Sequence, residues 1–377
     1  MKILIAGDFA PRARLAKQIE EKRFSEVFPE NLRKVIASSD FSFVNFESPI
    51  VEDEYKPIPK CGPNLRCTPE AAEAVKYAGF TGVTMANNHI LDYGAEGLNK
   101  SIECCKDQGL NVVGVGSNLI EAGATLYLKK DGMTLAVINC CEHEFSIATD
   151  KEAGANPLNP IRQFYAIQEA KQKADYVLII VHGGHEHFQL PSPRMVETYR
   201  YFIDAGADAV VNHHQHCYSG YETYQGKPIV YGLGNFLFDW PGETRQTWFE
   251  GYFAEIDFSP ECISLAIKPY IQCKENPNVR FMDEEESLRF QESITALNGI
   301  IRDDEKLSMA ISQYYEKSSW GELFSVEPYR GKLFKKLAYW GILPKMMNTA
   351  KRLGLINHIN CESHRDKLLY ALKKSIE

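Results

Sequence analysis

Hydrophobic and polar positions alternate in blocks along residues 1–273 of the chain. Short apolar runs, of the length typical of buried strands, are separated by amphipathic segments with helical periodicity. Strands that alternate with helices in this way favour an α/β fold. The expected strands are Ile3–Ala6, Phe41–Phe46, Phe80–Met85, Asn111–Val115, Ala124–Leu128, Thr134–Asn139, Tyr176–Val181, Ala209–Val211 and Pro228–Tyr231. The expected helices are Pro11–Glu21, a helix from Thr68 or Pro69 to about Ala78, Ala95–Gln108, Pro160–Ala174 and Pro193–Ala205.

The composition changes at about Lys274, so we predict two regions, residues 1–273 and a helical C-terminal region at residues 274–377. The second region contains amphipathic helical stretches and then basic segments rich in aromatic residues. Such segments can contact a membrane surface or a partner, but solvated faces and helix cores are the simpler interpretation, which we favour. The stretches are Glu284–Arg302, Lys306–Glu316, Tyr329–Tyr339 and Lys345–Arg352.

The composition of the chain is that of a globular protein: of 377 residues, 44% are hydrophobic and 24% are charged. The net charge of −8 does not indicate the basic surface that nucleic-acid binding requires, so we expect no nucleic-acid partner. The longest clean apolar run, Val177–Val181, is far too short to span a bilayer, and Met1–Asp8 is typical of a strand rather than a signal peptide. We therefore expect a cytoplasmic protein with no integral membrane segment.

The ten cysteines do not form the pattern of a disulfide scaffold in a chain of this length. Cys104-Cys105 and Cys140-Cys141 are adjacent pairs, which are poorly placed for ordinary bridges, and no CxxC pattern occurs. We expect free, mostly buried thiols, which supports a reducing compartment.

One strand ends in an unusual polar sequence, Asn87-Asn88-His89, followed by Asp92 and Gly94. Asn is depleted in strands and prefers turns, so strand formation does not explain these residues. Two interpretations are open from the motif alone. Asn87 or Asn88 is the N-cap of the following helix, or the motif is part of an active site.

Other strand and loop ends present further metal-ligand residue types, and these favour the active-site interpretation. Carboxylates, amide oxygens and imidazoles together suit a divalent ion such as Mn²⁺, Zn²⁺ or Fe²⁺. If the segment 214–216 is extended, the rings of His214 and His216 point to the same side. We predict a site for one or two such ions, with the ligands Asp8, Glu47, Asn88, His182, His214 and His216.

These motifs resemble those of the bacterial capsule-synthesis CapA family, also called poly-γ-glutamate synthesis PgsA-type proteins. The resemblance covers about Met1–Phe258 and implies a calcineurin-like metallophosphoesterase fold. We therefore expect the α/β class, as a four-layer αββα sandwich with a C-terminal helical region. The matching motifs are Gly7-Asp8, Asn45-Phe46-Glu47, Ala86–His89 with Asp92 and Gly94, His182–Gly184 with Glu186, His213–His216 and Tyr231–Phe236.

The resemblance also implies roles for single residues. The six predicted ligands match the metal ligands of phosphoesterases, with Glu47 in the bridging position, and His89 resembles the histidine that protonates the leaving group. The chain departs from the pattern at two positions. Ala10 stands where phosphoesterases usually have a histidine, and Gly183 stands where the family often has a tryptophan.

The function implied is metal-dependent hydrolysis of a phosphoester, or of an amide in a polyanionic polymer, linked to capsule or exopolymer metabolism. We assign His89 as the acid; Asp92 either orients His89 or caps the following helix, and Glu186 is a ligand, a base or a rim charge. The alternatives are a non-catalytic accessory component of polymer biosynthesis and a ligand-sensing module. The expected partner is a small or polymeric anionic substrate, and the oligomeric state is left open. The candidate substrate-binding residues are Asn45, Asn87, His185 and Asn235.

Overall fold

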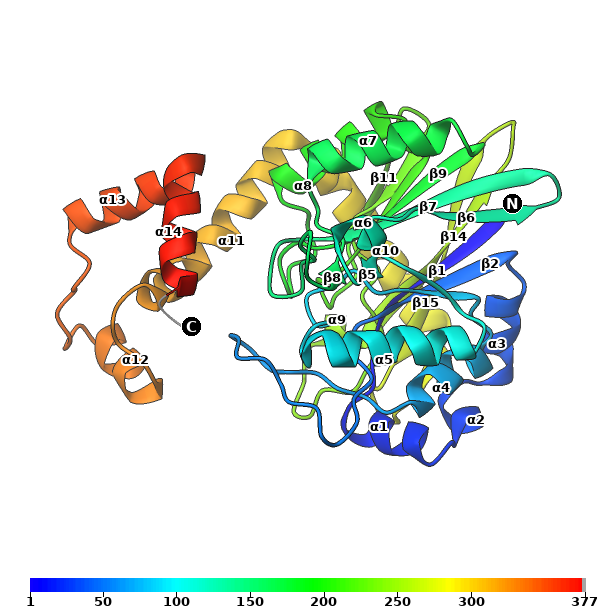
Figure 1. Ribbon diagram of the computed structural model, residues 1–377, viewed down its shortest axis with the longest axis horizontal. Helices are drawn as coiled ribbons and strands as arrows, with labels where there is room; N and C mark the ends of the chain where they lie inside the picture. The colour runs from blue at the N-terminus through cyan, green and yellow to red at the C-terminus, as the bar shows by residue number, and fades with distance from the viewer. Residues whose placement is uncertain (375–377) are drawn as a thin grey trace. The chain divides into compact units, whose positions relative to one another are not determined.

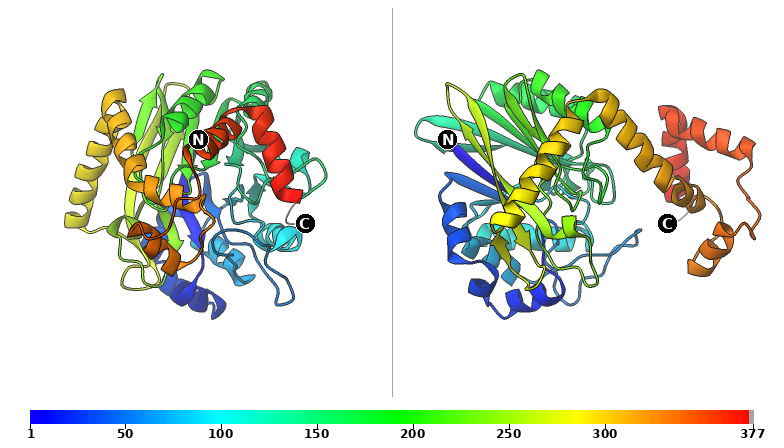
Figure 2. Two further views of the ribbon diagram at one scale, coloured as in Figure 1. Left: turned by 90° about the vertical axis from the view of Figure 1, so that its left-hand side faces the viewer. Right: turned by 180° about the vertical axis from the view of Figure 1, so that it is seen from behind.

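The computed structural model describes residues 1–374 and divides into two compact units. The first unit runs from Met1 to Leu307, and the second begins at Ser308 (Figure 1). The first unit therefore extends past residue 273, where the composition changes. It includes α10 (Glu284–Ile301), whose Phe290 ring lies 4.7 Å from the Tyr218 ring and 5.8 Å from the Tyr252 ring. Figure 2 shows α10 on the outside of the strands, beside β11.

The first unit has four layers, with helices, two mixed sheets and helices in turn (Figure 1). The larger sheet has the order β16-β15-β14-β1-β2-β3-β4, with β13 also paired to β1, and the smaller has the order β11-β12-β10-β9-β7-β6. This arrangement confirms the predicted αββα sandwich. The strands of the larger sheet are β1 (Lys2–Ala10), β2 (Phe41–Phe46), β3 (Gly82–Thr84), β4 (Asn111–Val113), β13 (Asn235–Phe238), β14 (Glu250–Phe258), β15 (Ile263–Gln272) and β16 (Val279–Phe281). Those of the smaller sheet are β6 (Leu126–Lys130), β7 (Met133–Cys141), β9 (Tyr176–His182), β10 (Ala209–His213), β11 (Tyr221–Tyr224) and β12 (Lys227–Val230).

Helices cover the outer face of each sheet, as Figure 1 shows for α5 on one side and α7 on the other. The helices beside the larger sheet are α1 (Ala13–Glu20), α2 (Phe24–Val27), α3 (Glu30–Ala37), α4 (Glu70–Ala78) and α5 (Gly94–Asp107), and those beside the smaller are α7 (Pro160–Lys171) and α8 (Pro193–Asp204). Short elements are β5 (Val115–Gly116), α6 (Leu119–Ala122), β8 (Gly154–Ala155) and α9 (Gln246–Phe249). The C-terminal helices are α11 (Asp304–Ser325), α12 (Lys332–Tyr339), α13 (Thr349–Asn360) and α14 (Glu362–Lys374).

The apolar runs form strands that are buried on both faces. Val177–Val181, in the middle of β9, is fully buried because β7 and β10 flank it in the sheet while helices and the other sheet cover its faces. β9 and β10 run parallel, as do β1, β2 and β3 in the other sheet. Parallel strands end at the same edge of a sheet, so the residues after these strands are brought together.

The structure excludes the N-cap interpretation of the asparagine motif. Neither Asn87 nor Asn88 caps α5, which begins at Gly94 after Tyr93 and has no side-chain cap. The segment between the first two strands also contains two helices that were not predicted, α2 and α3, and α3 buries Leu32 and Ile36 against the core.

The cysteines are free thiols, as predicted. Six of the ten are buried, and burial raises the pKa of the buried Cys140 and Cys141 thiols, which makes them poor nucleophiles. Among the described residues, no helix has both the length and the apolar composition required to cross a bilayer.

Candidate metal centre

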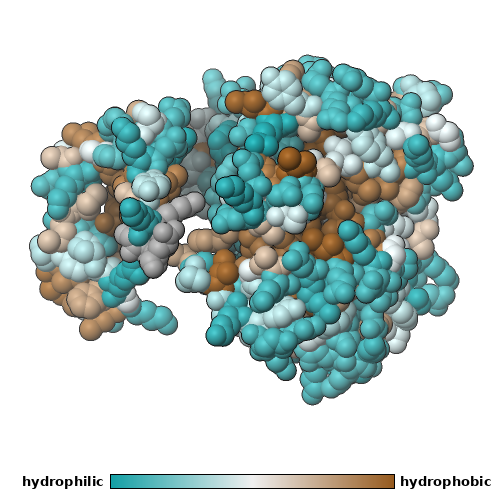
Figure 3. Space-filling model, viewed as in Figure 1, coloured by the Kyte–Doolittle hydropathy of each residue, from teal (hydrophilic) through white to brown (hydrophobic). Residues whose placement is uncertain are grey.

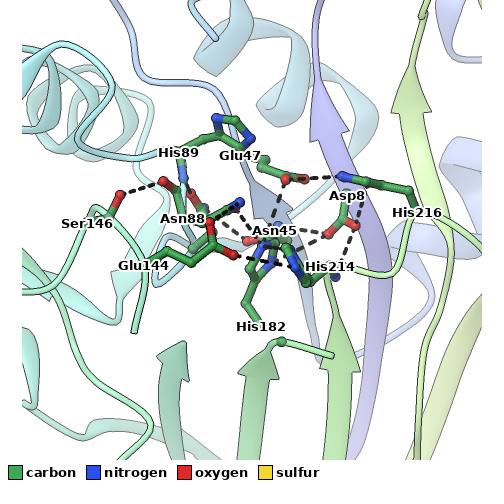
Figure 4. A network of polar contacts seen from close by, with 12 residues as sticks. Asp8, Asn45, Glu47, Asn88, His89, Glu144, Ser146, His182, His214 and His216 are labelled. Carbon is green, nitrogen blue, oxygen red and sulfur yellow. Dashed lines mark hydrogen bonds and ion pairs between the residues drawn. The ribbon is translucent and has the colours of Figure 1, made fainter. Parts of the chain in front are cut away.

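The six predicted ligands lie together where the strands of both sheets end (Figure 4). Three come from the larger sheet and three from the smaller one. Asp8 is in β1, Glu47 follows β2, Asn88 follows β3, His182 ends β9, and His214 and His216 follow β10.

Five of these residues form two groups that share Glu47. In each group, Glu47 with His182 and His214 or Glu47 with Asp8 and His216, the ligand atoms lie within 4.8 Å of one another. Glu47 Oε1 lies 3.8 Å from His182 Nε2 and 3.7 Å from His216 Nε2. A carboxylate shared by two such groups would be available to both ions of a two-metal site.

The buried Glu47 carboxylate indicates that a cation fits this position. Within the part of the chain that the structure describes, neither of its oxygens has a hydrogen-bond partner. A buried carboxylate without a partner is strongly destabilising unless a positive charge compensates it. Burial and the neighbouring charge of Asp8 both raise the pKa of Glu47 well above its usual value, and a divalent cation would reverse that effect.

The histidines differ in their electrostatic environment. Burial and the neighbouring imidazole of His214 lower the pKa of His182, and burial with the neighbouring His216 lowers the pKa of His214. Both are therefore neutral at physiological pH, which is the form that binds metal. Burial also acts against the charged form of His216, but Glu47 and Asp8 outweigh it and raise its pKa to about 10.

The backbone of the 214–216 segment is not extended, so the alternation of side chains along an extended segment does not explain how the two rings meet. His214 has φ of +94° and His216 has φ of +53°, in the region that residues with a side chain rarely adopt. Both rings nevertheless reach the site: His214 Nδ1 lies 3.1 Å from His182 Nε2, and the His214 and His216 ring centroids are 6.1 Å apart. Such strained conformations are concentrated at functional sites.

Three buried asparagines belong to the hydrogen-bond network around the ligands. Asn45 donates to Asp8 Oδ1 at 2.8 Å, Asn87 donates to Asn45 Oδ1 at 3.2 Å, and Asn235 Oδ1 lies 2.9 Å from His216 Nδ1. These three side chains are buried and form hydrogen bonds with the ligands or with one another, as residues that orient metal ligands do. Their predicted contact with a substrate stays a prediction.

Asn88 presents its carbonyl oxygen to the ligand cluster. Its Oδ1 lies 3.1 Å from His182 Nε2, while its Nδ2 donates to Glu144 Oε2 at 3.2 Å and its backbone oxygen accepts from Ser146 at 2.8 Å. Glu144 also approaches His214, at 3.7 Å from Nε2. Glu144 and Ser146 follow the end of β7. A search for polar residues after strand ends, which found the six predicted ligands, could therefore have found these two residues as well.

His89 lies beside the cluster, with its ring outside the two ligand groups (Figure 4). His89 Nδ1 is 2.6 Å from Asp92 Oδ2, and Asp92 also accepts from the backbone N–H of Leu65 at 2.6 Å. The ammonium of Lys60 pairs with Asp92 and lies 3.1 Å from His89 Nδ1, and its side chain is only 2% exposed. Asp92 is therefore hydrogen-bonded to His89 and is not the side-chain cap of α5. Lys60 was not predicted, because a single lysine in a proline-rich loop has no distinguishing pattern.

A cavity of about 230 Å³ opens beside the ligand cluster. Glu186, with its side chain 50% exposed, stands at this cavity beside His187, while His185 is not among the lining residues. The position of Glu186 fits a base or a rim charge, and the two ligand groups do not include it. The lining residues are Pro63, His89, Glu186, His187, His216, Phe238, Trp240, Glu243, Arg245 and Trp248.

The fold and the site together define a two-sheet αββα protein with carboxylate, amide and imidazole ligands at the shared carboxyl edge of its strands. The family model described as bacterial capsule synthesis protein PGA_cap matches residues 2–240, and the chain belongs to this family. The family resemblance inferred from the motifs is thereby confirmed.

Several relatives have names that refer to capsule or polymer synthesis. The capsule biosynthesis protein CapA of Bacillus anthracis is 32% identical over 253 residues, which are 65% of this chain and 61% of that protein. The PGA biosynthesis protein CapA of Bacillus subtilis is 33% identical over 243 residues, which are 63% of each. The chain thus spans somewhat less than two thirds of the length of these relatives. A hypothetical protein from Thermus thermophilus overlaps 72% of this chain and 98% of its own, at 16% identity and a TM-score of 0.43, which is too low to support a functional inference.

Proposed function

We propose that this protein is a metal-dependent hydrolase of the CapA family that cleaves a phosphoester, or an amide of a polyanionic polymer, in capsule or poly-γ-glutamate metabolism. The observation that supports catalysis most directly is the position of His89. Its ring lies at the cavity wall, outside both ligand groups, and is held by Asp92. A metal that only stabilises the fold needs no oriented imidazole beside it.

Two sets of residues would hold the cations. Glu47, Asn88, His182 and His214 would hold one, and Asp8, Glu47 and His216 would hold the other. When bound, a divalent cation supplies Lewis-acid activation of water and of the oxygens of the scissile group.

The chain's own residues supply orientation and the proton. Because the Nδ1 atom of His89 is engaged with Asp92, Nε2 is the atom that can reach a substrate in the cavity. His89 Nε2 would donate a proton to the leaving group as negative charge develops there. Asp92, fixed by Lys60 and the Leu65 N–H, keeps the ring in position for this transfer.

The test is turnover by metal-loaded protein on a phosphomonoester, a phosphodiester and a γ-glutamyl peptide. We expect His89→Ala to keep its fold and metal content and to lose about 10²- to 10⁴-fold in kcat, the usual contribution of acid–base assistance. His358→Ala, which removes an exposed histidine of α13, should change neither quantity. Loss of metal from His89→Ala would instead make His89 a ligand.

A non-catalytic accessory role is the second candidate, and Ala10 favours it. At the position where phosphoesterases usually have a histidine, Ala10 packs in an apolar cluster with Leu65, Phe238 and Trp248. One relative, from Mycobacterium tuberculosis, is named "Probable polyglutamine synthesis accessory protein" and is 26% identical over 222 residues. Metal-loaded protein that binds a γ-glutamyl oligomer but turns over none of the three substrate classes would support this alternative.

A further inference from the structure

The carboxylate of Glu144 lies beside the candidate metal centre and takes no part in the mechanism proposed above. Glu144 follows β7 of the smaller sheet, its side chain is 35% exposed, and neither ligand group includes it. Its two oxygens face two different ligands, Asn88 and His214 (Figure 4).

The first of these contacts concerns the amide of Asn88. One end of an asparagine side chain accepts hydrogen bonds and can bind a cation, whereas the other end only donates. Glu144 Oε2 accepts from Asn88 Nδ2 at 3.2 Å, and Asn88 Oδ1, at the other end, lies 3.1 Å from His182 Nε2. Turning the amide over would put its oxygen against the Glu144 carboxylate. Glu144 therefore favours the one orientation in which Asn88 can be a metal ligand.

The backbone of Asn88 is held by the same loop. The hydroxyl of Ser146, two residues after Glu144, donates to the Asn88 backbone oxygen at 2.8 Å and accepts from the Leu91 N–H at 3.3 Å. The segment 144–146 thus fixes both the main chain and the amide of this ligand.

The second contact concerns the imidazole of His214. His214 Nδ1 lies 3.1 Å from His182 Nε2, so Nδ1 is the nitrogen that points into the ligand group. Glu144 Oε1 faces the other nitrogen, Nε2, at 3.7 Å. A carboxylate that faces the outer nitrogen of a metal-binding histidine favours the proton on that nitrogen and leaves the inner one free for the metal.

The surroundings of this loop are partly apolar. Phe145, next to Glu144, is 42% exposed, and Figure 3 shows hydrophobic residues at the surface between the helices that Figure 1 labels α5 and α7. Hydrogen bonds of a charged group are stronger where apolar neighbours lower the local dielectric. The contacts of Glu144 with the ligands are therefore stronger than those of a carboxylate in bulk water.

We propose that Glu144 is a positioning residue that holds Asn88 and His214 in the orientations that a bound metal requires. This inference rests on the proposed metal site and adds to it a residue that is not itself a ligand. Asn88 follows β3 of the larger sheet and His214 follows β10 of the smaller one, so a single carboxylate aligns ligands from both sheets.

The test is the affinity of the full chain for Mn²⁺, measured by titration calorimetry. Glu144→Ala should bind the tighter ion about 10- to 100-fold more weakly, the usual effect of removing a partner of a metal ligand. Glu144→Gln keeps the size of the side chain, which guards against a defect in folding, and should also lose affinity because an amide cannot accept from both partners. The matched control Glu169→Ala removes an exposed carboxylate of α7 and should bind as the wild type does.

A double-mutant cycle separates positioning from simple attraction of the cation by charge. In Asn88→Asp both side-chain oxygens can bind a cation, so no amide has to be oriented. Glu144→Ala should therefore cost clearly less affinity in this background than in the wild type. An effect of charge alone would be the same in both backgrounds and would shrink as salt is added.

The outcomes distinguish this proposal from the metal site on which it rests. Wild-type affinity in Glu144→Ala would overturn the role of Glu144 and leave the metal site intact, and equal losses in the two backgrounds would overturn that role as well. A wild type that binds no Mn²⁺ would overturn both.

Discussion

At the scale of single residues, the two buried imidazoles next to Glu47 provide the direct test of the proposed metal site. His182 and His214 are neutral and lie in one ligand group, so the variant H182A/H214A should be purified without metal. Mn²⁺ at 100 times its Kd should stabilise the wild type by about 2.7 kcal/mol and leave this variant unaffected. Elemental analysis and thermal melts with and without Mn²⁺ measure both effects. Unchanged metal content in the variant would refute the assigned site.

The two ligand groups should differ in affinity. The group with Glu47, His182 and His214 is completed by Asn88, whereas the group with Asp8, Glu47 and His216 has Ala10 where a histidine would add a ligand. We expect one tightly held ion and one weaker ion, with activity rising as Mn²⁺ is added. Titration calorimetry gives both affinities. Two equally tight ions would show that another side chain, such as Glu144 or Glu186, completes the weaker group.

Lys60 should be a major contributor to stability, because its partner is fully buried. Removing one member of a buried ion pair leaves the other charge uncompensated, at a cost of about 3–5 kcal/mol. Lys60→Met should therefore destabilise the fold by about this amount in urea, and the additional change Asp92→Asn should restore part of the loss. Lys17→Met, which breaks an exposed pair with Glu21, should change stability by less than about 1 kcal/mol. A small effect of Lys60→Met would mean that water reaches Asp92.

Residues at strand ends could be predicted, and residues on loops could not. Asp8, Glu47 and His182 stand at positions where a parallel strand delivers a side chain to the sheet edge, so residue type and position were sufficient. Lys60 lies in an irregular loop. Hydrogen bonds from Ile58, Asn64 and Leu65 to Asp92 hold this loop at the site. No periodicity in the sequence indicates that the loop would reach Asp92.

At the scale of elements, the start of α10 is set by a capping box. Asp283 accepts from the Glu286 N–H, and Glu286 accepts from the Asp283 N–H and pairs with Arg280. The Arg280 hydrogen bonds lower the pKa of Glu286 from 4.5 to about 2. A carboxylate with a lowered pKa in the folded state stabilises the fold above its unfolded pKa, and this contribution is lost as the pH falls from about 4.5 toward about 2.

Glu286→Gln should therefore destabilise the protein by about 1–2 kcal/mol at pH 7, the scale of a hydrogen bond to a charged group. The difference from wild type should shrink as the pH is lowered through that interval. Urea melts at several pH values measure this. Glu285→Gln, one position earlier and exposed, is the control and should have an effect near zero at every pH. A pH-independent effect of Glu286→Gln would show that packing rather than charge is responsible.

Element boundaries depended on contacts that the sequence does not display. The helix after the Asn87-Asn88-His89 motif begins later than a capping asparagine would require, because both amides are used by the site. β10 continues to His213, whose Nε2 lies 2.9 Å from the Ala6 backbone oxygen in the other sheet, a contact between distant parts of the chain.

At the scale of the whole molecule, the first unit should fold without most of the C-terminal helices. A chain that ends at Glu316 keeps α10 and should have a melting temperature close to that of the full chain. A chain that ends at Cys273 loses the buried Phe290 and Ile294 of α10 and uncovers Tyr218 and Tyr252, so it should melt many degrees lower or aggregate. Differential scanning calorimetry of the two truncations decides the point. Equal melting temperatures would place the domain boundary at residue 273 after all.

The alternating pattern predicted an α/β fold and the family resemblance predicted its four layers, but neither predicted the strand order. β13 pairs with β1 although Asp8 and its register partner Asn235 are far apart in the sequence, and only tertiary contacts determine that pairing. The first unit likewise ends at Leu307 because α10 packs against its strands. Composition alone had assigned α10 to the C-terminal helical region.

The candidate ligands come from both sheets, and this has a consequence for folding and exchange. Asp8 and Glu47 belong to one sheet and His182 and His214 to the other, so the ligand groups exist only after the sheets have docked. A cation bound there joins the sheets at one end only. Amide hydrogen exchange should therefore slow on metal loading at the carboxyl ends of β1 and β10, while the amino-terminal ends of the same strands keep their rates.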